Sequence, residues 1–247
     1  MKQLKRYLPV LLLATCWSCS KMDLSEDIGF FSNGDMADYT AIVSVRVSPT
    51  DTVYFQADEQ TRLFPRRDRD SFRGLERILC GVRISNETVP NYGFLTEVLW
   101  FDSLDKGTTT SAASVVGDDP VEVLSDWMTS CEDGYLTLHY EDWWGERTMP
   151  HAFYLVTGLN PDDPYEVWLR HDAKGDSRKK KADSLVYFDL QSLPDPGDGS
   201  VTLTLKLKNG EGKTLDKPFT FKSRRIERTG TGPSGPQWRP FRDALSV

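Results

Sequence analysis

The segment from residue 201 to residue 208 alternates strictly between apolar and polar side chains. Val201, Leu203, Leu205 and Leu207 are separated by threonines and lysines. Because successive side chains of a β-strand point to opposite faces, this period of two predicts an antiparallel strand with one buried and one solvated face. The buried face needs a second sheet to pack against, so the segment favours a β-sandwich.

The second half of the chain contains five further strand-like runs, at residues 134–140, 152–157, 165–170, 184–190 and 218–222. Turn sequences rich in Asn, Asp, Gly and Pro separate these runs. Their short, regular spacing, without a segment of helical period, is typical of a sandwich. We expect residues 121–226 to form this β-sandwich domain.

The first half of the chain contains shorter candidate strands, at residues 40–48, 52–57, 62–65, 74–85 and 92–101. Their close succession favours an OB-like β-barrel domain over residues 39–103. The small, polar segment 104–120 predicts a linker, and the Gly- and Pro-rich residues 227–247 predict a disordered tail. The predicted fold class is therefore all-β, with a small OB-like barrel followed by an antiparallel β-sandwich.

The N-terminus has the form of a secretory signal peptide. Lys2, Lys5 and Arg6 precede a short apolar run over residues 7–14. This run is well below the roughly 20 residues that a membrane-spanning helix needs. A charged start, a short apolar middle and small residues near a cleavage point predict a signal peptide over residues 1–18.

A cysteine just after such a cleavage point is typical of a bacterial lipoprotein. Cys19 follows Ser18, a small residue that suits cleavage, whereas the alternative, Cys16, follows the less suitable Thr15. We therefore expect lipidation on Cys19, with residues 19–38 as a flexible tether. The predicted location is the cell envelope, lipid-anchored to the outer membrane and exposed at the cell surface.

Several segments resemble the NigD-like lipoproteins. In the second half these are residues 132–140 (EDGYLTLHY), 143–145 (WWG), 160–171 (NPDDPYEVWLRH) and 186–190 (VYFDL), and in the first half, less closely, 54–58 (YFQAD) and 63–65 (LFP). The resemblance implies an envelope lipoprotein with an N-terminal OB-like domain and a C-terminal β-sandwich domain. The family has no settled biochemical activity, so no catalytic or ligand residue is carried over, and a bacteriocin-related role is one interpretation.

The sequence contains little evidence for a metal site or a catalytic site. His139, His151 and His171 could gather with carboxylates around zinc, but neither an HExxH motif nor paired CxxC motifs accompany them. We therefore interpret His139 as part of a solvated strand face, and predict no metal, no cofactor and no catalytic residue. Cys80 and Cys131 lie in different predicted domains, which favours unpaired thiols.

The remaining candidates concern partners. A net charge of −7 argues against nucleic-acid binding. The basic run 178–181 is interpreted as a solvated loop. Trp143 and Trp144 are adjacent, so in a strand one faces the core and the other faces outward. An exposed tryptophan beside carboxylates predicts a contact with a protein partner, or alternatively with a glycan at the envelope.

Overall fold

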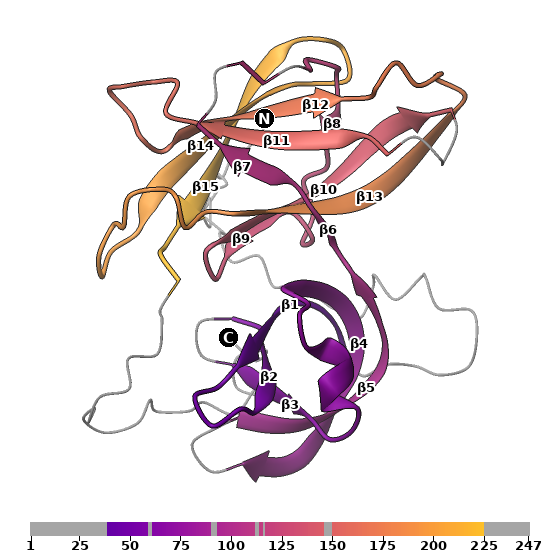
Figure 1. The fold of residues 1–247 in the computed structure, drawn as a ribbon, viewed down its shortest axis with the longest axis vertical. Coiled ribbons are helices and arrows are strands. Elements are labelled where there is room, and N and C mark those ends of the chain that lie inside the picture. The colour runs from indigo at the N-terminus through magenta and orange to yellow at the C-terminus, as the bar shows by residue number, and fades with distance from the viewer. Residues whose placement is uncertain are drawn as a thin grey trace, which may run out of the picture. The chain divides into compact units, whose positions relative to one another are not determined.

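The computed structural model of this chain describes residues 39–58, 61–89, 93–111, 114–115, 117–145 and 150–224 (Figure 1). These residues form β-strands together with one short 3-10 helix, η1 (Arg69–Phe72). The all-β fold class predicted from the sequence is confirmed. Among the described residues, no helix has the length and apolar character needed to cross a membrane. The signal peptide, the tether and the tail predicted at residues 1–18, 19–38 and 227–247 lie outside the described residues.

The first five strands close into a barrel in the order β1-β2-β3-β5-β4. Their bounds are β1 (Tyr39–Val47), β2 (Val53–Gln56), β3 (Arg62–Pro65), β4 (Arg77–Val89) and β5 (Gly93–Ser103). The pair β3–β5 is parallel and the other pairs are antiparallel. Closure leaves no unpaired sheet edge, and apolar side chains such as Val43, Phe55 and Ile78 fill the interior. A small barrel was predicted over these residues.

The following strands form the two sheets of a sandwich (Figure 1). One sheet has the order β6-β13-β10-β8, with β9 also paired to β10, and contains β6 (Asp105–Lys106), β8 (Glu122–Val123), β9 (Ser130–Glu132), β10 (Tyr135–Trp144) and β13 (Lys180–Asp189). The other has the order β15-β14-β12-β11-β7, and contains β7 (Thr108–Thr110), β11 (Ala152–Thr157), β12 (Glu166–Asp172), β14 (Val201–Lys208) and β15 (Thr214–Phe221). Side chains from both sheets, including Leu138, Leu155 and Leu205, share one core.

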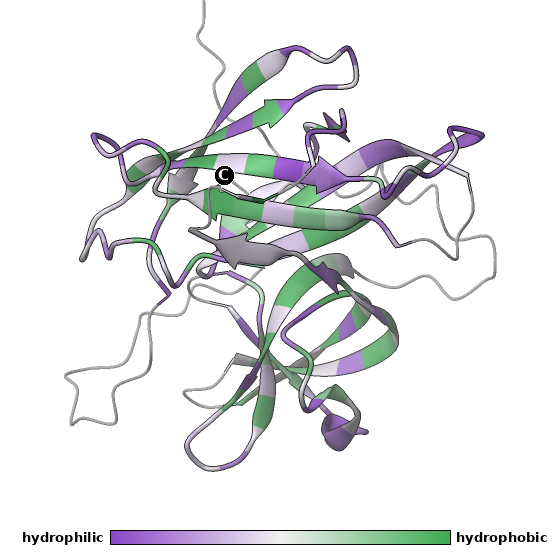
Figure 2. Cartoon of the chain, turned by 45° about the horizontal axis from the view of Figure 1, so that its top comes forward, coloured by the Kyte–Doolittle hydropathy of each residue, from purple (hydrophilic) through white to green (hydrophobic). Residues whose placement is uncertain are grey.

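Strand β14 behaves as its alternation predicts. Leu203, Leu205 and Leu207 are buried in the sandwich core, whereas Thr204 and Lys206 remain partly exposed. The same alternation of hydrophobic and hydrophilic residues along other strands can be followed in Figure 2. β14 is antiparallel to β15 but parallel to β12, and the pairs β6–β13 and β7–β11 are parallel as well. The sandwich is therefore mixed rather than purely antiparallel.

The segment 104–120, predicted as a linker without strands, in fact contributes a strand to each sheet. β6 pairs with β13, and β7 pairs with β11. Gly107 between them passes close to the core, because a Cβ there would lie 2.1 Å from Cε1 of Phe188. Strands of two and three residues are too short to produce a period, which explains why the sequence pattern missed them. The division into separately folding domains stays a prediction.

Candidate functional site

Strand β10 presents the two adjacent tryptophans to different surroundings. Trp144 packs against the sandwich core, whereas the side chain of Trp143 is 39% exposed. On the neighbouring strand β13, Lys181 lies opposite Trp143 in the register. Its Nζ atom lies 5.8 Å from the centroid of the Trp143 ring, within the range of a cation–π contact. The inward and outward placement follows from the pleat of the strand, as expected from the sequence.

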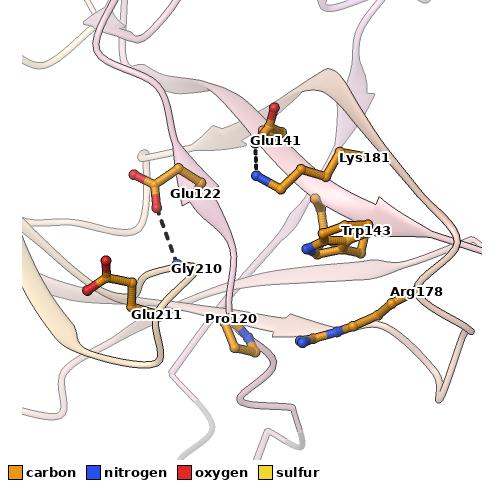
Figure 3. Close-up of a pocket in the computed structure, with 9 residues that line it drawn as sticks. Pro120, Glu122, Glu141, Trp143, Arg178, Lys181, Gly210 and Glu211 are labelled. Carbon is orange, nitrogen blue, oxygen red and sulfur yellow. Dashed lines mark hydrogen bonds and ion pairs between the residues drawn. The ribbon is translucent and has the colours of Figure 1, made fainter.

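Trp143 lines a pocket of about 350 Å³ on the surface of the sandwich (Figure 3). Its lining residues come from the segment before β8, from β8, β10 and β13, from the loop before β13 and from the β14–β15 turn. They are Pro120, Glu122, Glu141, Asp142, Trp143, Arg178, Lys181, Gly210 and Glu211. In Figure 3 the indole of Trp143 lies between the side chains of Lys181 and Arg178. The pocket therefore combines an aromatic ring with side chains of both charges.

Two interactions order the walls of this pocket. Lys181 donates from Nζ to Oε1 of Glu141, across the β10–β13 pair. The backbone N–H of Gly210 donates to Oε2 of Glu122 over 3.2 Å, which ties the β14–β15 turn to β8. Carboxylates, a guanidinium and an indole can form hydrogen bonds, ion pairs and stacking contacts with a bound molecule.

The basic run 178–181 was predicted to be a solvated loop, yet two of its members line the pocket. Arg178 lines the pocket from the loop before β13, and Lys181 lies within β13 itself. The register of β10 and β13 pairs Trp143 with Lys181 and would have identified that lysine, whereas Arg178 lies before the paired residues. A single sequence does not contain that register, because it depends on where the intervening turns lie.

His139 is buried, so the solvated strand face predicted for it is wrong. The side chain contacts two carboxylates: Nδ1 lies 2.5 Å from Oδ2 of Asp126, and Nε2 lies 3.1 Å from Oδ2 of Asp183. Residues 124–129 fold over this position, where the backbone of Leu124 donates to the His139 carbonyl and Thr129 accepts from its N–H. The hydrogen bond with His139 holds the pKa of the Asp183 carboxyl below its ordinary value.

The other two histidines lie together with a residue that the sequence analysis did not single out. Ligand atoms of Asp142, His151 and His171 all lie within 4.8 Å of one another. Asp142 belongs to β10, His151 precedes β11 directly, and His171 belongs to β12. Burial lowers the pKa of His171, while the charge of Asp142 raises it in opposition. Asp142 was missed because its pattern is simply that of a polar strand residue.

The cysteines of the described residues are unsuited to nucleophilic chemistry. Cys80 and Cys131 are both free, as the sequence favours. Burial raises the pKa of each thiol to about 12, so both are protonated at neutral pH. Cys19 and the alternative Cys16 lie outside the described residues, and the lipidation of either stays a prediction.

Comparisons with known proteins agree with this architecture. The family model of the NigD-like C-terminal beta sandwich domain matches residues 105–222. No curated protein matches the chain.

Solved structures share the fold across both the barrel and the sandwich. A "Putative TOXIN related protein" from Parabacteroides distasonis is 24% identical, with a TM-score of 0.58, over 74% of this chain and 93% of that one. A NigD-like immunity protein from Bacteroides caccae is 18% identical, with a TM-score of 0.53, over 77% and 99%. A "Putative lipoprotein" from Bacteroides fragilis is 12% identical, with a TM-score of 0.53, over 77% and 99%.

Proposed function

We propose that this chain, whose residues 105–222 match the family model of the NigD-like C-terminal beta sandwich domain, is a NigD-like cell-envelope lipoprotein with a non-enzymatic binding or structural role. In this proposal a lipid on Cys19, or alternatively on Cys16, anchors the folded part to the outer membrane at the cell surface. The similar "Putative lipoprotein" from Bacteroides fragilis supports the lipoprotein character. The buried, protonated thiols of Cys80 and Cys131 are consistent with a role that is not catalytic.

The pocket around Trp143 is the observation that carries the binding role. Tryptophan and arginine are the residues that most often dominate protein–protein binding energies. Here an exposed indole and the guanidinium of Arg178 share one pocket, rimmed by carboxylates that a partner's basic groups would pair with. We therefore assign the pocket to a protein partner at the envelope.

A protein toxin is the narrower form of this proposal. One similar structure is named a NigD-like immunity protein. Its identity to this chain is 18%, so the name supports a bacteriocin-related role only as a hypothesis. The same pocket would serve that contact.

A carbohydrate ligand is the alternative, because an exposed indole next to carboxylates can stack on a sugar ring and accept bonds from its hydroxyls. Lys181 approaches one face of the Trp143 ring, so a sugar would stack on the other face. Trp144 is unsuited to this role, since its ring stacks on His151 with centroids 3.9 Å apart.

The test compares the full chain with two matched variants. Trp143→Ala removes the proposed contact, and Trp168→Ala removes another partly exposed tryptophan that also has a cation near its ring. Chemical crosslinking on whole cells, followed by mass spectrometry, should yield a partner that Trp143→Ala loses and Trp168→Ala keeps. A glycan array gives the second arm: glycan retention with the same dependence on Trp143 would favour the carbohydrate alternative. Identical crosslinks and identical glycan retention for Trp143→Ala and the unmodified chain would contradict a binding role for this pocket.

A further inference from the structure

Two imidazoles and one carboxylate meet at a nearly equilateral triangle of atoms inside the sandwich. Oδ2 of Asp142 lies 2.9 Å from Nδ1 of His151 and 3.1 Å from Nε2 of His171. The two ring nitrogens are themselves 3.1 Å apart. All three side chains are almost completely buried, with 5%, 0% and 1% of their surfaces exposed. Atoms with this spacing can all lie about 2 Å from one common point, the distance of a zinc–ligand bond.

Without a metal ion, hydrogen bonds leave some nitrogen atoms of the two imidazoles without a partner. A neutral imidazole carries one N–H, so if both rings donate to Asp142, their outer nitrogens carry lone pairs. Those outer atoms, Nε2 of His151 and Nδ1 of His171, are buried and have no hydrogen-bond partner. In addition, Nε2 of His151 lies 3.4 Å from a carboxylate oxygen of Asp176, where a lone pair would be repelled. A cation inside the triangle reverses this arrangement, because the inner nitrogens then supply lone pairs and the outer nitrogen of His151 carries the proton toward Asp176.

The surroundings fix the ligands in the way that metal sites require. A histidine ligand typically directs its second nitrogen at a carboxylate, which is the position of Asp176. Asp176 is itself held by the backbone N–H groups of Gly145 (2.8 Å) and Ser177 (2.7 Å). Gly145 permits this approach, because a Cβ there would lie 2.1 Å from Oγ of Ser177.

Aromatic rings hold both imidazoles in orientation. The ring of Trp144 stacks on His151 at 3.9 Å with an interplanar angle of 9°. The ring of Phe153 stacks on His171 at 4.6 Å with an angle of 13°. An apolar shell of this kind limits water and strengthens the attraction between a cation and its ligands.

We propose that Asp142, His151 and His171 bind one divalent transition-metal ion, with zinc as the best match to two imidazoles and a carboxylate. The fourth position of a tetrahedral ion is left for a water molecule. Asp142 lies on β10 of one sheet, whereas His171 lies on β12 and His151 borders β11 of the other sheet. The ion therefore joins the two sheets of the sandwich, and its role is to stabilise the fold.

The test uses the full chain without a polyhistidine tag, stripped of metal by a chelator. Thermal unfolding is then measured with and without zinc for the unmodified chain and for Asp142→Asn, His171→Gln and His139→Gln. At a zinc concentration about 100-fold above the dissociation constant, we expect the melting temperature to rise by about 5–10 °C. The rise should disappear in Asp142→Asn and His171→Gln, and persist in His139→Gln, whose histidine contacts other carboxylates. A rise that persists in folded Asp142→Asn overturns the proposal.

A second measurement covers the case in which the buried variants do not fold. Cobalt added to the metal-free, unmodified chain should give the visible absorption of a four-coordinate ion, without a thiolate charge-transfer band. The missing thiolate band separates this site from binding by Cys16 and Cys19. A folded chain that shows neither this absorption nor a zinc-dependent melting temperature overturns the proposal.

Discussion

Replacing Leu205 by alanine tests the two-faced character of β14. Leu205 is completely buried, and β14 lies inside its sheet, between β12 and β15. Three carbon groups are lost from the core, at about 0.8 kcal/mol each, which gives about 2.4 kcal/mol for their transfer. Hydrogen-bonded strands on both sides limit how far the site can collapse, so a cavity term adds to this loss. We expect a total cost of about 3–4 kcal/mol, within the range of about 2–5 kcal/mol seen for such truncations.

Thr204→Ala is the matched control on the neighbouring position. Thr204 is only partly exposed, and its backbone N–H donates to the carbonyl of Tyr165, a bond that alanine retains. Its cost should remain within about 0.5–1 kcal/mol. Both values come from urea unfolding of the full chain followed by tryptophan fluorescence, with the slope of the transition checked for each variant. Equal costs at positions 204 and 205 would refute the description of β14 as a strand with one buried face.

Three further predictions concern the anchor, a buried cation and acid stability. Cys19→Ala should abolish metabolic labelling with a fatty-acid analogue and release soluble protein; labelling that persists would assign the lipid to the upstream cysteine. Arg77→Ala should cost about 3 kcal/mol or more in urea unfolding, because the buried guanidinium donates to Thr137 over 2.7 Å and leaves a cavity when removed; a cost below about 1 kcal/mol would contradict this. The pKa of Asp183 is lowered in the folded chain, so its bond with His139 stabilises the fold at pH values above the ordinary carboxyl pKa of about 4. This stabilisation is lost as the pH falls through the pKa of the folded state. Asp183→Asn should therefore be slightly less stable than the unmodified chain at pH 7 and equally stable near pH 2. Unfolding curves at the two pH values check this, and a difference that grows on acidification would show that the sign is wrong.

The parts of the fold that the sequence predicted are those with a local physical cause. The period of two in β14 places Leu203 and Leu205 in the core without any knowledge of partners. The opposite placement of Trp143 and Trp144 follows in the same way from the pleat of a single strand. Local patterns therefore determine which side of a strand faces the core.

What the sequence could not provide depends on partners that are distant along the chain. His139 is buried because residues 124–129 cover it, and no pattern within β10 indicates that cover. The triangle of Asp142, His151 and His171 forms because β10 and β12, in different sheets, meet at one place. These polar residues lie together only because the two sheets pack against each other.

The connection between barrel and sandwich has a mechanical consequence when a force pulls on the barrel. β5 ends at Ser103 and β6 begins at Asp105, so the single residue Leu104 joins them. Its N–H is bonded to the carbonyl of Arg77, and the N–H of Gly107 is bonded to the carbonyl of Tyr187. A pulling force on the barrel is therefore transmitted to β6 and β7 without first extending a flexible linker. Because β6 and β7 belong to different sheets, both sheets bear that force.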